Sequence, residues 1–207
     1  MVIRMLVKVC GLKDKKNIND VSNLDIDFIG LIFYRKSKRF FDKDYLVKKN
    51  NKKIVGVFVN ETIDEIKRII KKYDLDYVQL HGDEDVRFCN EVNNFIDVIK
   101  VFRISHDFDF KSIDKFHNSC KYFLFDTKSK KYGGTGEKFE WNILKENKIN
   151  KDFFLSGGID DTDHQIIKNL DLSHLIGIDL NSKFELEPGK KDVKKLNTFL
   201  NKINENI

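Results

Sequence analysis

The chain has 207 residues and carries 38 basic against 33 acidic side chains, for a net charge of +5. Hydrophobic residues make up 41% of the chain, which is enough to fill a large core and excludes an intrinsically disordered protein. No apolar run approaches the ~18 residues of a membrane span, the amino terminus lacks a signal-peptide pattern, and three cysteines without framework spacing argue against a disulfide scaffold. We therefore expect a soluble cytoplasmic protein with reduced cysteines.

Short runs of β-branched and aromatic residues recur along the whole chain and predict eight β-strands. Several of these runs, such as FIGLIF and IVGVFV, are apolar nearly throughout. That pattern is typical of strands covered on both faces of a parallel sheet. The predicted strands are Leu6–Gly11, Asp27–Phe33, Lys53–Asn60, Tyr77–Gly82, Asp97–Ile104, Tyr122–Thr127, Phe153–Gly158 and Leu175–Leu180.

Apolar residues recur at helical spacing in the segments between these strands. The stretch TIDEIKRIIKKYD places its isoleucines on one face, and Thr62 and Glu65 stand at capping-box spacing at its start. Strand and helix patterns alternate eight times without a linker, which predicts a single domain over residues 1–207, a closed (β/α)₈ (TIM) barrel with outer helices. The structural alternative is an open doubly wound sheet, but no dinucleotide glycine fingerprint follows the first strand.

Chemistry in such barrels sits at the carboxyl ends of the strands, so the residues at those ends are the first candidates. Cys10 ends the first predicted strand, where it is a core residue or a reagent. Asp126 ends the sixth strand, under a glycine-containing loop over 127–139 that could close over a substrate. Proton transfer and a plain turn or cap are equally good interpretations of Asp126.

Three further strand ends carry residues suited to binding an anion. Gly157 and Gly158 follow the seventh strand, and their backbone N–H groups can approach a phosphate closely. Arg39, in the loop after the second strand, can bind a carboxylate through two hydrogen bonds, whereas its basic neighbours are expected to be solvated. His81 follows the fourth strand, either as a structural histidine or as a substrate contact. No second His or Cys stands at ligand spacing, so no metal site is predicted.

The basic excess could favour an anionic partner, from a phosphorylated metabolite to nucleic acid. Most lysines, however, lie among acidic and asparagine residues on predicted helix surfaces. Aromatic residues do not interleave with them as in a single-strand binder. We therefore expect no nucleic acid and no membrane among the partners.

These motifs, taken together and in this order, resemble the phosphoribosylanthranilate isomerase family over nearly the whole chain. The stretches that carry the resemblance are VKVCGL, GLIFYRKSKRFF, VGVFVN, VQLHGDE, FDTKSKKYGGTGEKFEW, FLSGGID and IGIDLNSKFELEPGKKD. That family is a (β/α)₈ barrel of tryptophan biosynthesis, and it converts N-(5-phosphoribosyl)anthranilate to 1-(2-carboxyphenylamino)-1-deoxyribulose 5-phosphate by an Amadori rearrangement. The resemblance implies a phosphorylated small-molecule substrate, no cofactor and no obligatory protein partner.

The resemblance also implies roles for the candidate residues. Cys10 would be the general base and Asp126 the general acid, while Arg39 would hold the anthranilate carboxylate. His81 would lie in the site. The phosphate would be held by Gly157 and Gly158 and by the segment from Asp179 to Ser182.

The chemistry needs a thiolate and a protonated carboxyl group, yet a free thiol has a pKa of roughly 8.5 and a free aspartate one of roughly 3.9. Lys8 stands two residues before Cys10 on the same strand, so both side chains project to one side. A positive charge there would favour the thiolate.

Three rival functions remain at this point. Indole-3-glycerol phosphate synthase is a sibling barrel enzyme, but its catalytic lysine and glutamates are not found in place here. A barrel that binds phosphosugars without catalysis is the second. A nucleic-acid binder is the third, and its affinity would fall steeply with salt.

Overall fold

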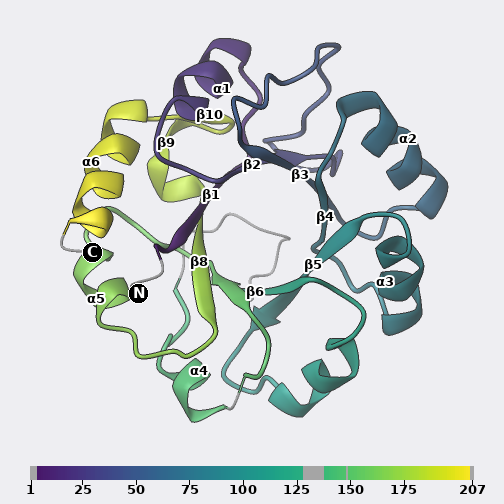
Figure 1. Cartoon of the computed structure of the whole chain (residues 1–207), viewed down its shortest axis with the longest axis vertical. Helices are drawn as coiled ribbons and strands as arrows, with labels where there is room; N and C mark the ends of the chain where they lie inside the picture. Colours follow the sequence, from purple (N-terminus) through teal and green to yellow (C-terminus); the bar gives the residue numbers. More distant parts are fainter. Residues whose placement is uncertain (1–3, 128–137, 148, 206–207) are drawn as a thin grey trace.

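Eight parallel strands close into a barrel in the computed structural model, which describes residues 4–127, 138–147 and 149–205. The strands follow one another around the ring in chain order, and the helices lie outside it (Figure 1). All eight predicted strands are confirmed, as is the (β/α)₈ fold. Their bounds are β1 (Leu6–Cys10), β2 (Phe28–Ile32), β3 (Lys53–Phe58), β4 (Tyr77–Leu80), β5 (Asp97–Ile104), β6 (Tyr122–Thr127), β7 (Phe153–Leu155) and β8 (Leu175–Leu180).

Oxygen-bearing side chains start the longer outer helices. Asp14, Asp85 and Asp192 each accept a backbone N–H bond three residues further on, which satisfies a donor that the first turn leaves free. The helices are α1 (Lys15–Ser22), α2 (Ile63–Tyr73), α3 (Val86–Asn93), α4 (Ile143–Glu146), α5 (His164–Lys168) and α6 (Val193–Asn204), with 3₁₀ turns η1 (Phe110–Phe116) and η2 (Ser182–Phe184). None of the helices in these described ranges is long and apolar enough to cross a membrane.

The predicted capping box at α2 forms only in part. Thr62 accepts a hydrogen bond from the Glu65 N–H, as expected. The Glu65 carboxylate, however, is held by Arg68 one turn later, and the Thr62 N–H donates to Glu61 instead. Only one of the two hydrogen bonds of a capping box therefore forms, the one from the Glu65 N–H to the Thr62 hydroxyl.

One connection departs from the predicted alternation of strand and helix. Residues 33–52 join β2 to β3 without forming a helix. The segment is dense in charged residues and lacks an apolar helical stripe, so aromatic side chains cover the barrel there instead. Phe41 packs against Phe33, Tyr45 and Tyr73 with ring centroids 5.4–6.0 Å apart.

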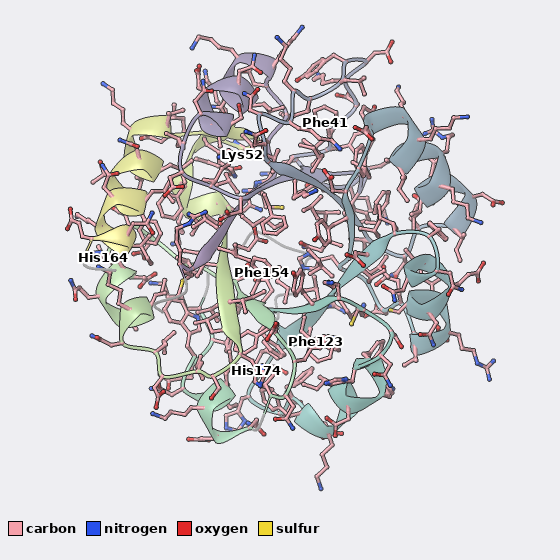
Figure 2. All side chains as sticks on the ribbon, in the orientation of Figure 1. Phe41, Lys52, Phe123, Phe154, His164 and His174 are labelled. Atoms are coloured by element: carbon pink, nitrogen blue, oxygen red, sulfur yellow. The ribbon has the colours of Figure 1, made fainter. Side chains whose placement is uncertain are left out.

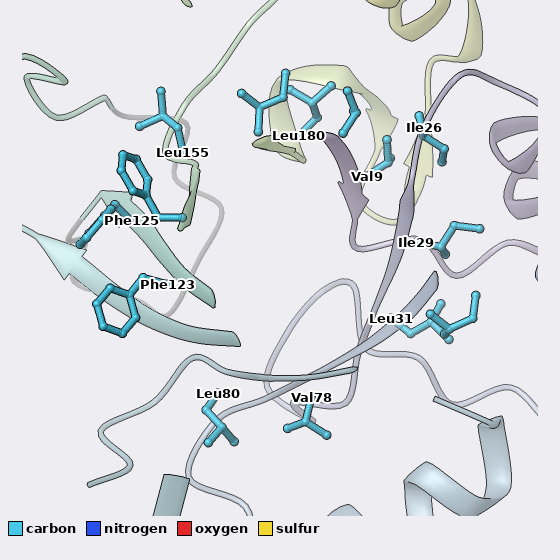
Figure 3. Packing of buried hydrophobic residues seen from close by; sticks show 14 of the residues in the cluster. Val9, Ile26, Ile29, Leu31, Val78, Leu80, Phe123, Phe125, Leu155 and Leu180 are labelled. Atoms are coloured by element: carbon cyan, nitrogen blue, oxygen red, sulfur yellow. The ribbon is translucent and has the colours of Figure 1, made fainter. Parts of the chain in front are cut away.

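Alternate residues of each strand face opposite sides of the barrel wall. The outward-facing ones, such as Val9, Ile29 and Leu80, pack against the helices and form the larger core (Figure 3). The smaller core lies inside the barrel, where Phe154 is near the centre of Figure 2. Four rings close the amino-terminal end of the interior, with neighbouring centroids 5.4–6.1 Å apart: Phe28, Tyr77, Tyr122 and Phe154. These four rings form an apolar floor at the amino-terminal end of the barrel, so the polar side chains of the interior lie toward its carboxyl-terminal end.

The barrel closes where β1 pairs with β8. Lys8 and Asp179 are register partners across this seam, and the Lys8 ammonium lies 2.9 Å from both carboxylate oxygens. Both side chains are buried, so the pair compensates two charges that neither water nor surface groups reach. After β8 the chain forms a short antiparallel hairpin, β9 (Glu185–Glu187) and β10 (Lys190–Lys191), before α6.

Candidate active site

Cys10 and Asp126 stand at the carboxyl ends of β1 and β6. Asp126 is two residues beyond Leu124, which belongs to the core inside the barrel, and Cys10 is two residues beyond the interior Lys8. Because side chains alternate along a strand, both residues face the interior at its open end. Cys10 is a free thiol, 3% exposed. Cys89 and Cys120 are also free and buried, but they belong to the outer core.

Gly30 makes room for the Cys10 side chain. The two residues are register partners on β1 and β2, and a Cβ atom at Gly30 would lie 2.7 Å from the Cys10 sulfur and 2.9 Å from its Cα. Any larger residue would displace the thiol from its present position. The sequence analysis missed this residue because nothing in FIGLIF identifies the strand that pairs with β1.

Two lysines flank the Cys10 thiol. Burial raises the pKa of Cys10 above its ordinary value, and the positive charges of Lys8 and Lys191 offset this effect only in part. Asp179 opposes the lysines because its carboxylate also acts on Cys10. The prediction that Lys8 and Cys10 project to one side is confirmed. Lys8 does favour the thiolate, but burial has the larger effect, so the net result favours the protonated thiol.

Asp126 lies beside His81. Its Oδ1 accepts the Thr127 N–H at 2.8 Å, and its Oδ2 lies 3.3 Å from His81 Nε2. No described residue makes a hydrogen bond of good geometry to this Nε2, although the atom is buried. The Gln79 amide nitrogen lies 3.3 Å from His81 Nδ1, and if it donates there, the neutral ring carries its proton on Nε2, so that this N–H faces Asp126. His81 is therefore next to the candidate acid.

The loop that follows β7 lies against the end of β6. Gly157 and Gly158 have φ angles of +88° and +72°, which an L-residue with a side chain rarely adopts. A Cβ at Gly157 would also lie 2.8 Å from the Thr127 backbone nitrogen and 3.3 Å from Asp126 Oδ1. The glycines thus bring the predicted phosphate loop into contact with the candidate acid. The short helix α5 follows this loop and begins at His164.

The segment from Asp179 to Ser182 follows the closing seam. The Asp179 carboxylate is bonded to Lys8, and as an anion it does not bind a phosphate, so only the backbone of this residue can contribute to a phosphate site. Its backbone carbonyl faces Ser156, whose hydroxyl lies 3.5 Å away. Ser182 is half-buried at the start of η2, beyond the end of β8.

Arg39 reaches the far side of the same mouth from the loop after β2. Its guanidinium is held by Glu185 of the hairpin, whereas Arg35, Lys36 and Lys38 are exposed, as predicted. Arg39 Cδ would lie 2.7 Å from a Cβ atom at Gly11, the residue after Cys10. Arg39 is therefore adjacent to the candidate base.

A second buried ion pair holds the loops after β3 and β4. Lys100 Nζ lies 2.8 Å from Glu84, and Glu84 accepts the N–H groups of Asn60 and Gly82. These contacts of Glu84 fix the loop that carries His81. Glu84 and Lys100 could not be identified from the sequence, because one lies in a loop and the other in the following strand, and only the folded barrel brings them together. Glu185 and Lys191 could not be identified either, because the hairpin that pairs them was not predicted.

Two further predictions concern the loop after β6 and a metal site. Most of the loop expected to close over the substrate, with Gly133, Gly134 and Gly136, lies outside the described residues. Within the described ranges, no three His, Cys, Asp or Glu side chains are arranged to hold a metal ion. His164 lies at the edge of the molecule in Figure 2, and the ring of His174 contacts Asp152.

Comparison with known proteins identifies the family. The family model described as N-(5'phosphoribosyl)anthranilate (PRA) isomerase matches residues 7–202. The N-(5'-phosphoribosyl)anthranilate isomerase of Parabacteroides distasonis is 41% identical over 96% of this chain and 93% of its own length. That of Phocaeicola vulgatus is 35% identical over 98% of this chain and the whole of its own.

Solved structures agree with these relatives. Phosphoribosyl anthranilate isomerase from Thermotoga maritima superposes with a TM-score of 0.81 at 28% identity, covering 98% of both chains. The enzyme from Thermus thermophilus superposes with a TM-score of 0.84 at 24% identity, covering 96% of this chain and 98% of its own, and at that identity it supports the fold alone. The chain therefore belongs to the N-(5'-phosphoribosyl)anthranilate isomerase family, the isomerases of tryptophan biosynthesis that act on a phosphorylated small molecule.

Proposed function

We propose that this chain carries out the family's isomerisation at the open end of its barrel, with Cys10 as general base and Asp126 as general acid. The observation that supports this most strongly is their position: two proton-transfer groups project inward from β1 and β6 over an apolar floor. His81 supplies an N–H group beside Asp126, and Lys8 and Lys191 supply positive charge beside Cys10, so each group has a neighbour that stabilises its anionic form.

The first step opens the ribose ring. Asp126 donates its proton to the ring oxygen, the bond from that oxygen to C1 breaks, and the lone pair of the anilino nitrogen forms the C1–N double bond of a protonated Schiff base. His81, 3.3 Å from the Asp126 carboxylate, stabilises the negative charge that remains there.

The second step moves a proton from carbon. The Cys10 thiolate removes the C2 proton, and the electron pair forms the C1–C2 double bond of an enolamine while the nitrogen regains its lone pair. The enolamine gains a proton at C1 and loses one from the C2 hydroxyl, which gives the ketone. No net proton is gained or lost, so the same two groups can serve both steps.

Substrate binding uses the residues around this pair. We propose that Gly157 and Gly158 hold the phosphate through backbone N–H groups and that Arg39 binds the anthranilate carboxylate. Ser182 and the backbone at Asp179 would complete the phosphate site, since the Asp179 side chain is bonded to Lys8. A structural neighbour, a phosphoribosyl anthranilate isomerase with a TM-score of 0.77 and 25% identity, was solved in complex with reduced 1-(o-carboxyphenylamino)-1-deoxyribulose 5-phosphate. That ligand carries both a carboxylate and a phosphate, which supports a site with a separate contact for each. The three buried, free cysteines support a location in the reducing cytoplasm.

The decay of phosphoribosylanthranilate fluorescence tests the assignment. We expect Cys10→Ser and Asp126→Asn each to lower kcat by at least ~10²-fold, the usual scale of acid–base catalysis. Cys89→Ser is the matched control, because Cys89 lies in the outer core, and it should leave kcat unchanged. Near-wild-type turnover in either site variant would refute its role. A wild-type chain that binds the reduced product analogue without consuming substrate would instead be a binding protein.

A further inference from the structure

The Arg39 guanidinium is hydrogen-bonded along its Nε–Nη2 edge only, among the described residues. Glu185 accepts hydrogen bonds from Nε at 2.9 and 3.0 Å and from Nη2 at 2.7 Å. No described residue accepts a hydrogen bond from Nη1. A guanidinium offers five N–H groups in a rigid plane, so the Nη1–Nη2 edge remains for a second carboxylate. The side chains are 13% and 5% exposed, which makes this a largely desolvated pair.

Glu185 is itself held in place by the hairpin. Lys191 Nζ and the Gly189 N–H lie 2.7 and 3.1 Å from Glu185 Oε1. Burial opposes ionisation of Glu185, but hydrogen bonds from Arg39 and the charge of Lys191 outweigh it and lower its pKa. The carboxylate therefore keeps its charge and both of its anchoring contacts at neutral pH.

The hairpin is fixed to the catalytic end of the barrel. Asn17 of α1 bonds the Lys191 backbone in both directions, at 2.8 and 2.7 Å. The Lys191 ammonium also donates to Asn181 Oδ1 at 2.7 Å, and that amide packs on Gly11, beside Cys10. One rigid chain of contacts thus runs from the base at Cys10 to the guanidinium of Arg39.

The charges of this cluster match a single bound carboxylate. Arg39 and Lys191 are cations and Glu185 is an anion, so the three sum to one positive charge when all are ionised. Without Glu185, two cations would lie side by side, and the flexible Arg39 side chain would have no partner to fix its plane. A bidentate contact depends on that plane, because both N–H bonds must point at the incoming oxygens.

We propose that Glu185 is a positioning residue for substrate recognition. It holds Arg39 by the Nε–Nη2 edge and so presents the Nη1–Nη2 edge to the carboxylate on the aromatic ring of the substrate. This inference rests on the proposed role of Arg39.

A pair of substrates isolates this effect. One is N-(5-phosphoribosyl)anthranilate, and the other is N-(5-phosphoribosyl)aniline, formed from aniline and ribose 5-phosphate, which lacks only the ring carboxylate. We expect Glu185→Gln to raise KM about 10-fold for the first, the scale of one charge-assisted hydrogen bond, with kcat within about 2-fold. KM for the second should not change. Glu187→Gln is the matched control, because it removes a carboxylate from the same strand without touching Arg39.

A purely structural role would affect both substrates alike, and that outcome would overturn the proposal. A lower KM for the carboxylate substrate would overturn it too, since Glu185 would then compete with substrate for Arg39. In an Arg39→Ala background, Glu185→Gln should add no further change. Should Glu185→Gln fail to fold, Glu185→Asp keeps the charge but breaks the two-point contact, and it should show the same discrimination.

The Arg39→Ala variant separates this inference from the function on which it rests. If Arg39→Ala raises KM equally for both substrates, Arg39 does not bind the carboxylate. The role proposed for Arg39 and the role proposed for Glu185 are then both refuted. If Arg39→Ala discriminates between the substrates and Glu185→Gln does not, only the positioning role of Glu185 is refuted.

Discussion

Cys10, the proposed base, has surroundings that disfavour the thiolate that this role requires. Burial raises the pKa of its thiol, and Lys8 and Lys191 are the cations that work against this. Lys191 is nearly fully buried, and burial lowers its own pKa to about 8, although Glu185 opposes the shift. The thiolate is therefore a minor species in the free enzyme at neutral pH. A substrate that excludes water while bringing a Schiff-base cation beside the sulfur would favour the thiolate only when it is needed.

The ultraviolet absorbance of the thiolate tests this view of Cys10. The difference in absorbance between wild type and Cys10→Ser should stay flat through neutral pH and rise only above pH 9.0, because burial raises the pKa of this thiol. Cys89 and Cys120 do not interfere, because burial raises their pKa values to about 11 and about 12. A titration step at or below neutral pH would contradict the protonated resting state.

At the scale of elements, β2 leaves room for Cys10, the proposed base, because its residue next to Cys10 is Gly30, which has no side chain. A Cβ on Gly30 would meet the Cys10 sulfur and Cα, so Gly30→Ala should move the thiol and lower kcat by about 10²-fold, the cost of a ~1 Å misplacement. Gly56→Ala is the control on β3. A Cβ there meets Leu75 and Phe58 in the outer core, so it should lower the melting temperature while the folded fraction keeps its kcat. Equal losses of kcat in both variants would refute a local effect at Cys10.

The elements were predictable where local pattern decides them. The strands followed from runs that are mostly apolar, because a strand covered on both faces buries nearly all of its side chains. Lys8, Gln79 and Lys100 interrupt three of these runs without obscuring the pattern. The connection over residues 33–52 was not predictable, since its cover consists of aromatic contacts with α2 that no spacing in the segment reveals. Cys10 and Asp126 were found because strand ends meet at one rim, whereas Glu185 was missed because its partner Arg39 is 146 residues away.

At the scale of the whole molecule, the buried pair at the β1–β8 seam fastens the first strand to the last. Asp179→Asn leaves the Lys8 ammonium without a compensating charge inside the barrel, so the free energy of unfolding in urea should fall by about 3–5 kcal/mol. The double variant Lys8→Met/Asp179→Asn removes both charges and should recover much of that loss. A double variant less stable than Asp179→Asn alone would show that the pair is not the cause.

The lysine in LVKVC was the one sign of this seam in the sequence. Lysine is almost never fully buried unless it is paired, so its place in an apolar strand indicates an interior acid. The identity of that acid could not be read from the sequence, because the closing register of the barrel decides it.

The seam also sets an order of events during biosynthesis. Lys8 and Asp179 are 171 residues apart, and ribosomes add ~5–20 residues per second, so β1 waits roughly 10–30 s for the strand that completes it. Through that interval the nascent sheet has an unpaired edge and an unmatched ammonium group among its apolar side chains. The charge makes premature pairing with another chain costly and favours the acidic strand made last. We therefore expect Lys8, which lies beside Cys10 in the folded barrel, also to disfavour aggregation of the emerging chain.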